Sequence, residues 1–558
     1  MIDVGKRVRP AVAAAAAAAL LAAGCGGDGD GDGGGDGSPA AKAAGAGGYT
    51  VEITDRQPPA TKPIDAITWA LPYGEPTTID PIQAGDYAPD FMVSQMCDFL
   101  LRFTPKWELE PGLAESWDQP DDKTLVFKLR EGVTFWDGEP MTVDDVVYSL
   151  KRNLDEAAGS LTAPYFKNVR SIEGTGPSEV TVRFKAPDEL FLKEMAAGPG
   201  AVVQRAFTER AGKKVGTPRG GIMCTGPYEF VSWKPGTELR LQKNDDYWDP
   251  SLQPRIGKVT VSFLSETTTL TSALLSGEVD GAYGVPATSI PALSRADTGT
   301  LYYGESTQQL GIYSARPAGL MADPNVRKAL SLAIDRRAIA EKVYGGAAIP
   351  NQAVVSNTRE QEAKAVYEEG WKTLPSVEVD LEAAKELIAA VPDPAQPIVL
   401  AAPAGDQATL DVATLVQDAG KQLGLNVEIR PLQPLDLSNF YYKPEFRKGY
   451  DGVLSVSFSD HPDPLNFLPY VVYPDSYFNY SGWDSPEAVR LTDRAQRTLD
   501  PEARAEMLMQ VLKLEADDRV TIPLLGLANV SFISNAIGGA PTSFAYLWMP
   551  DFASMGGK

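Results

Sequence analysis

The sequence predicts an α/β protein with two or three lobes. A chain of 558 residues is longer than one hydrophobic core usually serves. From about residue 380, helical and strand patterns follow one another in turn, which is typical of an α/β lobe. Earlier segments alternate apolar and polar residues as half-buried strands do, and 43% of all residues are hydrophobic, enough for a substantial core.

The N-terminus predicts export and lipid anchoring. Three basic residues within the first nine precede a short apolar run from 11 to 23, a pattern that indicates a signal peptide over 1–24 and is too short for a membrane span. The run ends in Ala22-Ala23-Gly24-Cys25, which resembles a lipobox. Cleavage before Cys25 and acylation of its thiol would anchor the protein. An ordinary signal peptide with an incidental cysteine is the alternative.

A flexible, lipid-anchored tether is expected over 25–60. Gly, Asp, Ala and Ser dominate its first half, and such a composition cannot bury a core. Asp28, Asp30 and Asp32 have the spacing of an EF-hand loop, but position twelve is Pro39, so calcium binding is not expected.

Charge and cysteine content narrow the function. A net charge of −23 argues against nucleic acid as a partner, because phosphate binding needs clustered Lys and Arg. Cys97 and Cys224 form an even pair in a chain expected outside the cytoplasm, which predicts a disulfide; two buried thiols are the alternative.

The N-terminal half reads as strands with a few helices. Thr142 and Asp145 fit a capping box that opens a helix. Around the turn Lys234-Pro235-Gly236, apolar residues on both sides predict a hairpin from Tyr228 to Gln242. Other elements expected here are a first strand near 67–71, a helix from about 86 to 105, and strands near 125–129, 180–184 and 259–263.

The C-terminal half adds helices with marked starts. Asp323 is expected as an N-cap with Pro324 as the first helical residue. Beyond residue 380, helices are expected over 381–390, 408–423 and 501–518, with strands near 398–402 and 427–430.

Five blocks, in order, resemble family 5 extracellular solute-binding proteins, the oligopeptide, dipeptide and nickel receptors of ABC importers. They are Leu109-Glu-Pro-Gly-Leu-Ala-Glu-Ser-Trp117, Leu129-Arg-Glu-Gly-Val-Thr-Phe-Trp-Asp-Gly-Glu-Pro140, Cys224-Thr-Gly-Pro-Tyr with Trp233-Lys-Pro-Gly and Asn244-Asp-Asp-Tyr-Trp248, Val326-Arg-Lys-Ala-Leu-Ser-Leu-Ala-Ile-Asp-Arg336, and Asp460-His-Pro-Asp-Pro-Leu-Asn-Phe467.

The resemblance implies a type II periplasmic-binding-protein fold of the cluster C type, with two hinged lobes and an extra inserted domain. Lobe I would be discontinuous and comprise 61–85, 215–310 and 522–558. The inserted domain would span 86–214, and lobe II 311–521.

The implied function is capture of a solute between the lobes and its delivery to an ABC permease with its ATPase subunits. Oligopeptides or dipeptides are the favoured ligands, and oligosaccharides or a chelated metal are the alternatives. The protein is expected to act as a monomer in the periplasm or at the cell surface. A secreted, membrane-anchored hydrolase and a sensor lipoprotein of the same fold are the other hypotheses.

In peptide-binding members, the Asp that opens the last block pairs with the peptide α-ammonium, and the matching residue here is Asp460. Phe458, Tyr480 and Trp483 are further candidates for ligand contact. Those members often carry Trp three residues before the Asp, whereas this chain has Ser457, so ligand identity stays open.

Catalysis is not expected. His461 is the sole histidine and has no neighbouring nucleophile motif. A zinc site would need a His/Cys cluster, and no phosphate-binding loop is present, so no metal or cofactor is expected.

Overall fold

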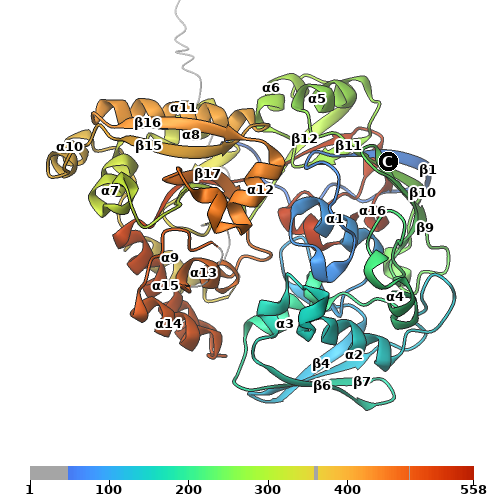
Figure 1. Cartoon of the computed structure of the whole chain (residues 1–558). Coiled ribbons are helices and arrows are strands. Elements are labelled where there is room, and N and C mark those ends of the chain that lie inside the picture. The colour runs from blue at the N-terminus through green and yellow to red at the C-terminus, as the bar shows by residue number, and fades with distance from the viewer. Residues whose placement is uncertain (1–47, 357–361, 475, 477) are drawn as a thin grey trace, which may run out of the picture. The chain divides into compact units, whose positions relative to one another are not determined.

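The computed structural model describes residues 48–356, 362–474, 476 and 478–558 (Figure 1). The predicted lipidation site Cys25, the signal peptide and the tether up to residue 47 lie outside these residues. In the described part, no helix combines the length and the apolar character that crossing a membrane requires.

A seven-stranded mixed sheet forms the centre of lobe I. Its spatial order is β12-β19-β11-β1-β10-β9-β8, and β1 runs parallel to both of its neighbours. The strands are β1 (Ile64–Leu71), β8 (Tyr228–Lys234), β9 (Glu238–Lys243), β10 (Ile256–Phe263), β11 (Gly281–Tyr283), β12 (Gly299–Gly304) and β19 (Asn529–Ser534).

The predicted hairpin is confirmed as β8 and β9. Lys234 pairs with Glu238 across a turn in which Gly236 has φ of +71°, the left-handed region that glycine adopts without strain. Leu239 and Leu241 are buried while Arg240 is exposed, so the alternation places one face of β9 in the core.

A six-stranded sheet forms the centre of lobe II, in the order β14-β18-β13-β17-β15-β16. The strands are β13 (Gln309–Ser314), β14 (Ala348–Pro350), β15 (Pro397–Pro403), β16 (Asn426–Leu432), β17 (Gly452–Ser457) and β18 (Thr521–Leu527). Because β18 pairs with β13 and β14, the segment 522–558 that the sequence assigns to lobe I begins with a strand of lobe II.

The helices of lobe II start where capping residues predict. Asp323 accepts a hydrogen bond from the Asn325 N–H at 2.8 Å and Pro324 is the first residue of α7 (Pro324–Ala333). Of the helices of this lobe in Figure 1, α11 (Gln407–Gln422) packs against β15 and β16, α8 (Arg336–Lys342) packs against β14 and β18, and α10 (Leu381–Ala389) packs against α7.

A four-stranded antiparallel sheet in the order β4-β5-β7-β6 lies within 86–214, the range predicted for the inserted domain. Its strands are β4 (Ala114–Asp121), β5 (Thr124–Leu129), β6 (Val169–Gly176) and β7 (Glu179–Phe184), and helices α2 (Val143–Lys151), α3 (Leu190–Glu194) and α4 (Arg205–Ala211) lie in the same range. Both halves of the predicted capping box, between Thr142 and Asp145, are formed at the start of α2.

The helix expected from about 86 to 105 is shorter than predicted. It forms α1 (Tyr87–Met96), ends at the extended residue Cys97, and is followed by β2 (Leu101–Phe103), which pairs with β3 (Leu109–Pro111). Although α1 falls in the range expected for the inserted domain, it packs against β8 and α16 (Asp551–Ser554), which belong with lobe I.

Two connections run between the central sheets of the lobes. One joins β12 to β13 and the other joins β18 to β19, and the Leu527 N–H donates to the Gln308 oxygen at 3.0 Å between them. Two short, paired connections suit a hinge.

The remaining α-helices and strands are α5 (Thr267–Ser276), α6 (Ile290–Leu293), α9 (Lys364–Trp371), α12 (Pro434–Tyr442), α13 (Pro464–Val472), α14 (Pro486–Gln496), α15 (Pro501–Asp518), β20 (Ile537–Gly538) and β21 (Gly556–Gly557).

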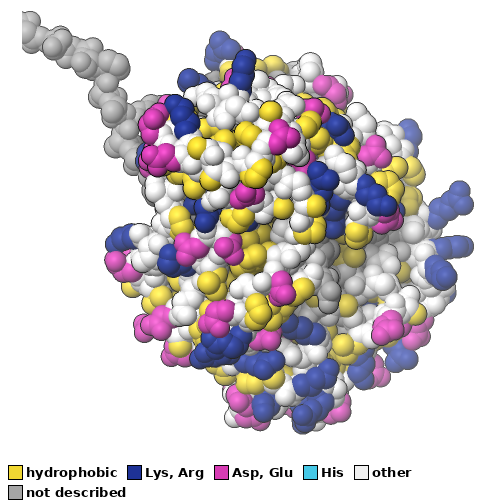
Figure 2. Space-filling model, turned by 60° about the vertical axis from the view of Figure 1, so that its left-hand side comes forward, with side chains coloured by type: hydrophobic (Ala, Val, Ile, Leu, Met, Phe, Trp, Pro, Cys, Tyr) yellow, Lys and Arg dark blue, Asp and Glu magenta, His cyan; other side chains and the backbone are white. Residues whose placement is uncertain are grey.

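Acidic and basic side chains are interspersed over the face drawn in Figure 2. On that face, therefore, the charges form a mixed, solvated surface of the kind that keeps proteins soluble.

Candidate ligand-binding site

Asp460 lies in the loop between β17 and α13, at the end of a buried strand of lobe II. Its backbone N–H donates to Oδ1 of Asn466 at 2.9 Å, and Nδ2 of the same Asn466 is 3.4 Å from its Oδ2. The hydroxyl of Tyr165, which belongs to the inserted domain, donates to Oδ2 over 3.1 Å. The carboxylate is therefore positioned where two parts of the molecule meet.

The Asp460 carboxyl is only weakly acidic. Burial raises its pKa to about 6, with the neighbouring Glu194 carboxyl as the second cause, while His461 and the hydrogen bonds from Asn466 and Tyr165 lower it. Among the described residues, no Lys or Arg forms an ion pair with Asp460. A cationic ligand group would supply the missing charge.

Glu194 and His461 form a second buried pair beside it. Glu194 Oε1 accepts a hydrogen bond from Asn466 Nδ2 at 2.8 Å and lies 3.1 Å from Nε2 of His461. Burial raises the pKa of Glu194 to about 8 and lowers that of His461 to about 4. Both groups are therefore neutral near pH 7, and their contact is a hydrogen bond between uncharged groups.

Aromatic rings of both lobes meet close to Asp460. Tyr73 and Tyr87 of lobe I stack at 4.1 Å, and Phe458 of lobe II lies 4.5 Å from Tyr87 and 5.6 Å from Phe544. Gln308, in one of the two inter-lobe connections, donates to the Tyr87 hydroxyl at 3.1 Å. The predicted contact residue Phe458 is thus at the junction of the lobes.

Two acidic residues of α1 face the same junction. Asp86 is the N-cap of the helix and Asp90 follows one turn later. The pKa of Asp90 is raised well above its usual value by burial and then by the charges of Asp460 and Asp86. In Figure 1, α1 lies beside α12 of lobe II. Burial raises the pKa of Tyr442, the last residue of α12, and the charges of Asp86 and Asp90 add to the rise.

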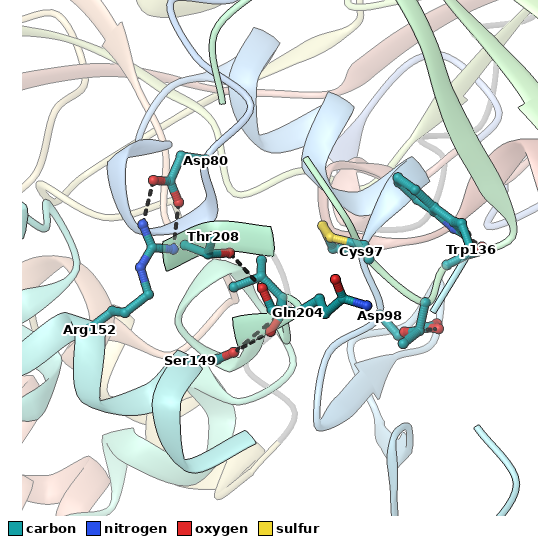
Figure 3. The surroundings of a disulfide bond; sticks show 12 residues. Asp80, Cys97, Asp98, Trp136, Ser149, Arg152, Gln204 and Thr208 are labelled. Carbon is teal, nitrogen blue, oxygen red and sulfur yellow. Dashed lines mark hydrogen bonds and ion pairs between the residues drawn. A yellow bond between two sulfur atoms is a disulfide. The ribbon is translucent and has the colours of Figure 1, made fainter. Parts of the chain in front are cut away.

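A disulfide holds the far end of α1 in place. Cys97 and Cys224 are bonded with an S–S distance of 1.99 Å, as expected from the sequence. Figure 3 shows neighbouring polar contacts, among them the two hydrogen bonds of Arg152 with Asp80, at 2.9 and 2.6 Å. Asp98, directly after Cys97, pairs with Arg102 at 3.2 Å. The position of α1 is consequently set by covalent and ionic contacts.

The other two predicted contact residues lie elsewhere in lobe II. Tyr480 is buried, 5.9 Å from Phe440, with the Arg447 guanidinium 4.1 Å from its ring centroid. Trp483 donates from Nε1 to Asp518 at 2.9 Å, at the C-terminal end of α15. Ligand contact by either residue stays a prediction.

A cavity of about 190 Å³ adjoins His461. Lys193, on its wall, pairs with Asp463 at 2.8 Å and lowers the pKa of that carboxyl against the effect of burial. The other lining residues are Phe103, Trp107, Glu108, Leu109, Glu362, Tyr367, Pro462, Pro464, Pro501 and Arg504. A second, open cavity of about 800 Å³ is lined by Arg102, Arg130, Trp248 and their neighbours. None of the four predicted contact residues lines either cavity.

Sequence reasoning missed several residues of this junction. Asn466 stands within the recognised block that begins at Asp460, so the block itself was a usable signal. Tyr165, Glu194 and Asp90 carry no local signal, because their partners lie hundreds of residues away in the chain.

Known proteins match this chain over most of its length. A model of bacterial extracellular solute-binding proteins, family 5 middle region, matches residues 108–479. Oligopeptide-binding protein OppA of Bacillus subtilis (strain 168) is 25% identical over 494 residues, which cover 81% of this chain and 85% of OppA. Glutathione-binding protein GsiB of Escherichia coli (strain K12) is 29% identical over 280 residues, 50% of this chain and 54% of GsiB.

Solved structures share the fold. The ABC transporter substrate-binding protein CtaP of Listeria monocytogenes has a TM-score of 0.76 at 21% identity and covers 88% of this chain and 99% of its own. AppA of B. subtilis, solved with a nonapeptide, has a TM-score of 0.74 at 21% identity, covering 89% and 100%. NikA of Staphylococcus aureus, solved with Ni(L-His)2, has a TM-score of 0.75 at 18% identity, covering 88% and 100%.

The fold is therefore the two-lobed type II binding-protein fold. Since the family model spans well over half of the sequence, the chain belongs to the bacterial extracellular solute-binding proteins of family 5.

Proposed function

We propose that the protein captures a peptide between lobes I and II and delivers it unaltered to the permease of an ABC importer. Members of the family are extracytoplasmic proteins that bind solutes and perform no chemistry. The observation that carries the peptide proposal is Asp460, a half-buried carboxylate held by neutral donors, without a cationic partner among the described residues.

A peptide supplies what this carboxylate lacks. Its α-ammonium is a compact cation that pairs with a desolvated carboxylate, while its backbone amides can pair with the exposed edges of strands and turns whatever the side chains are. OppA is named for oligopeptide binding, and the AppA structure contains a nonapeptide. The aromatic rings of Tyr87 and Phe458 would then pack against apolar parts of the ligand.

Lipid anchoring through Cys25 would keep the protein beside its permease, with the ATPase subunits on the other side of the membrane. A sensor of the same fold would also bind a ligand, but deletion of its gene would leave peptide uptake unchanged. Loss of uptake on deletion therefore supports import.

The direct test is calorimetry with trialanine and N-acetyl-trialanine on the wild type and on Asp460→Asn. Trialanine should bind the wild type, and Asp460→Asn should weaken it at least about thirtyfold, because the ammonium loses its ionic partner. The acetylated peptide should bind weakly to both. Asp418→Asn, an exposed acid on α11, is the matched control and should change neither affinity.

Native mass spectrometry of protein purified without refolding would identify retained cargo. A bound peptide of unchanged mass supports the proposal. A metal chelate or a sugar in its place, or equal binding of both trialanine forms, would overturn the peptide assignment.

A further inference from the structure

Asp90 is a buried carboxylate with an unfilled hydrogen-bonding position. Its side chain is 1% exposed, and its Oδ1 has no hydrogen-bond partner among the residues that the structure describes. A buried, unpaired carboxylate is costly, and such groups are retained where a ligand or a countercharge completes them.

The surroundings of Asp90 come from both lobes. Asp86 precedes it by four residues as the N-cap of α1; its side chain is exposed and accepts a hydrogen bond from the Tyr87 N–H at 2.8 Å. Across the junction, Asp460 and Tyr442 of lobe II interact electrostatically with Asp90. The start of α1 also contacts the loop of Asp460 directly, since the Tyr87 ring lies 4.5 Å from Phe458.

Other acids near α1 are paired with arginine. Asp98 is 3.2 Å from Arg102, Asp249 is 2.5 Å from the same guanidinium, and Asp80 is 2.6 Å from Arg152 (Figure 3). These ion pairs neutralise Asp80, Asp98 and Asp249, whereas Asp86 and Asp90, like the buried Asp551 of α16, have no ion pair among the described residues.

We propose that Asp90, together with Asp86 and Tyr442, forms a second cation-binding subsite next to Asp460, so that the protein prefers peptides with a basic side chain near the N-terminus. The inference rests on the proposed function and specifies its substrate class. Asp460 would hold the α-ammonium, Asp90 and Asp86 would hold the guanidinium or ammonium of the side chain, and the Tyr442 ring would lie against it as aromatic rings do with organic cations.

A purely structural role for Asp90 gives a different expectation. If the carboxyl stabilised only α1, its removal would lower the melting temperature and weaken all ligands alike. The subsite instead predicts a change in charge preference, so the ratio of affinities for a charged and a neutral ligand of the same shape separates the two roles.

The test compares Arg-Ala-Ala with citrulline-Ala-Ala, in which a neutral urea replaces the guanidinium at equal length. The wild type should bind the arginine peptide at least about tenfold more tightly. Asp90→Asn should reduce this ratio to about two or less, and Asp86→Asn should lower it partially. Asp65→Asn, which removes an exposed charge from β1 of the same lobe, should keep the wild-type ratio. Asp460→Asn should weaken both peptides and preserve the ratio.

A second probe separates this inference from the proposed function. 1,4-Diaminobutane carries two cations and no peptide group, and it should raise the melting temperature of the wild type more than that of Asp90→Asn. If neither peptide binds while the diamine raises the melting temperature of the wild type more than that of Asp90→Asn, the subsite is supported and the peptide function is overturned. If the peptides bind with equal affinity, or if Asp90→Asn keeps the preference for arginine, the subsite is overturned while the peptide function stands. If no probe binds, both are overturned. Should Asp90→Asn fail to fold, Asp86→Asn alone decides through the same ratio.

Discussion

The hydroxyl of Tyr165 donates a hydrogen bond of 3.1 Å to the carboxylate of Asp460, although the two residues are 295 positions apart. Tyr165 belongs to the inserted domain and Asp460 to lobe II. The pKa of Asp460, the proposed partner of the ligand ammonium, therefore depends on the contact between these two parts of the molecule. Any motion that separates them removes a donor from Asp460 and raises the pKa of its carboxyl.

Tyr165→Phe should weaken the binding of free-amine peptides about three- to tenfold at pH 7, which is the usual contribution of one hydrogen bond to a charged group. The same change should raise the pKa of Asp460 above 6, because the lost bond stabilises the ionised form. Calorimetry and a carboxyl NMR titration measure the two effects. Tyr302→Phe on β12 is the control and should change neither. An unaltered pKa in Tyr165→Phe would disprove the coupling.

Affinity for an α-ammonium ligand should rise as pH increases from about 5 to 7. The ligand pairs with ionised Asp460, whose pKa in the free protein is about 6, so below that pH a proton must leave before binding. Of its titratable neighbours, Glu194, with a pKa of about 8, stays protonated in this window and His461, with a pKa of about 4, stays neutral. The phenol of Tyr165 stays protonated too, since burial raises its pKa.

Calorimetry at pH 5, 6 and 7, in buffers of different ionisation enthalpy, would show both the slope and the proton released. Asp460→Asn should abolish both effects. Asp90→Asn tests whether Asp90, the remaining acidic neighbour, adds to the release. A flat profile in the wild type would contradict the assignment of Asp460.

Local patterns predicted much of the fold because their causes are local. The capping box of Thr142 and Asp145, the turn at Gly236 and the helix over 501–518 all depend on residues within a few positions of each other. The sheet to which β18 belongs and the short length of α1 depend instead on distant partners, β13 for the strand and Cys224 for the helix.

The site divides in the same way. Asp460 and Phe458 were accessible through a recognised block, and the structure places both at the junction of the lobes. Asp90 has no signal in the sequence, because nothing in its neighbourhood in the chain indicates that it is buried and that Asp460 affects its pKa. Burial, which gives Asp90 and Glu194 their unusual acidities, is a property of the folded chain alone.

Glu194→Gln should flatten the dependence of stability on pH. The folded-state pKa of Glu194 is about 8, above the 4.5 expected when unfolded, so the native state holds an extra proton between these values. Its contribution is fully present below pH 4.5 and is lost as pH rises through 8, by up to about 5 kcal/mol.

Urea unfolding at pH 5 and pH 9 would measure this change. The wild type should lose more stability than Glu194→Gln between the two pH values. Glu156→Gln, an exposed acid of the inserted domain, should follow the wild type. Parallel profiles for the wild type and Glu194→Gln would show that Glu194 is already ionised in the folded protein.

Replacing both Cys97 and Cys224 with alanine should lower the free energy of unfolding by about 5 kcal/mol, because the crosslink closes a loop of 127 residues in the unfolded chain. Urea unfolding with and without reductant measures the loss: the wild type should fall to the level of the double variant on reduction, and the double variant should not respond. Since the disulfide also fixes the end of α1, the double variant should bind Arg-Ala-Ala less tightly even where it is fully folded. Unchanged affinity in the folded double variant would mean that the polar contacts of Asp98 with Arg102 and Tyr247 suffice to position the helix.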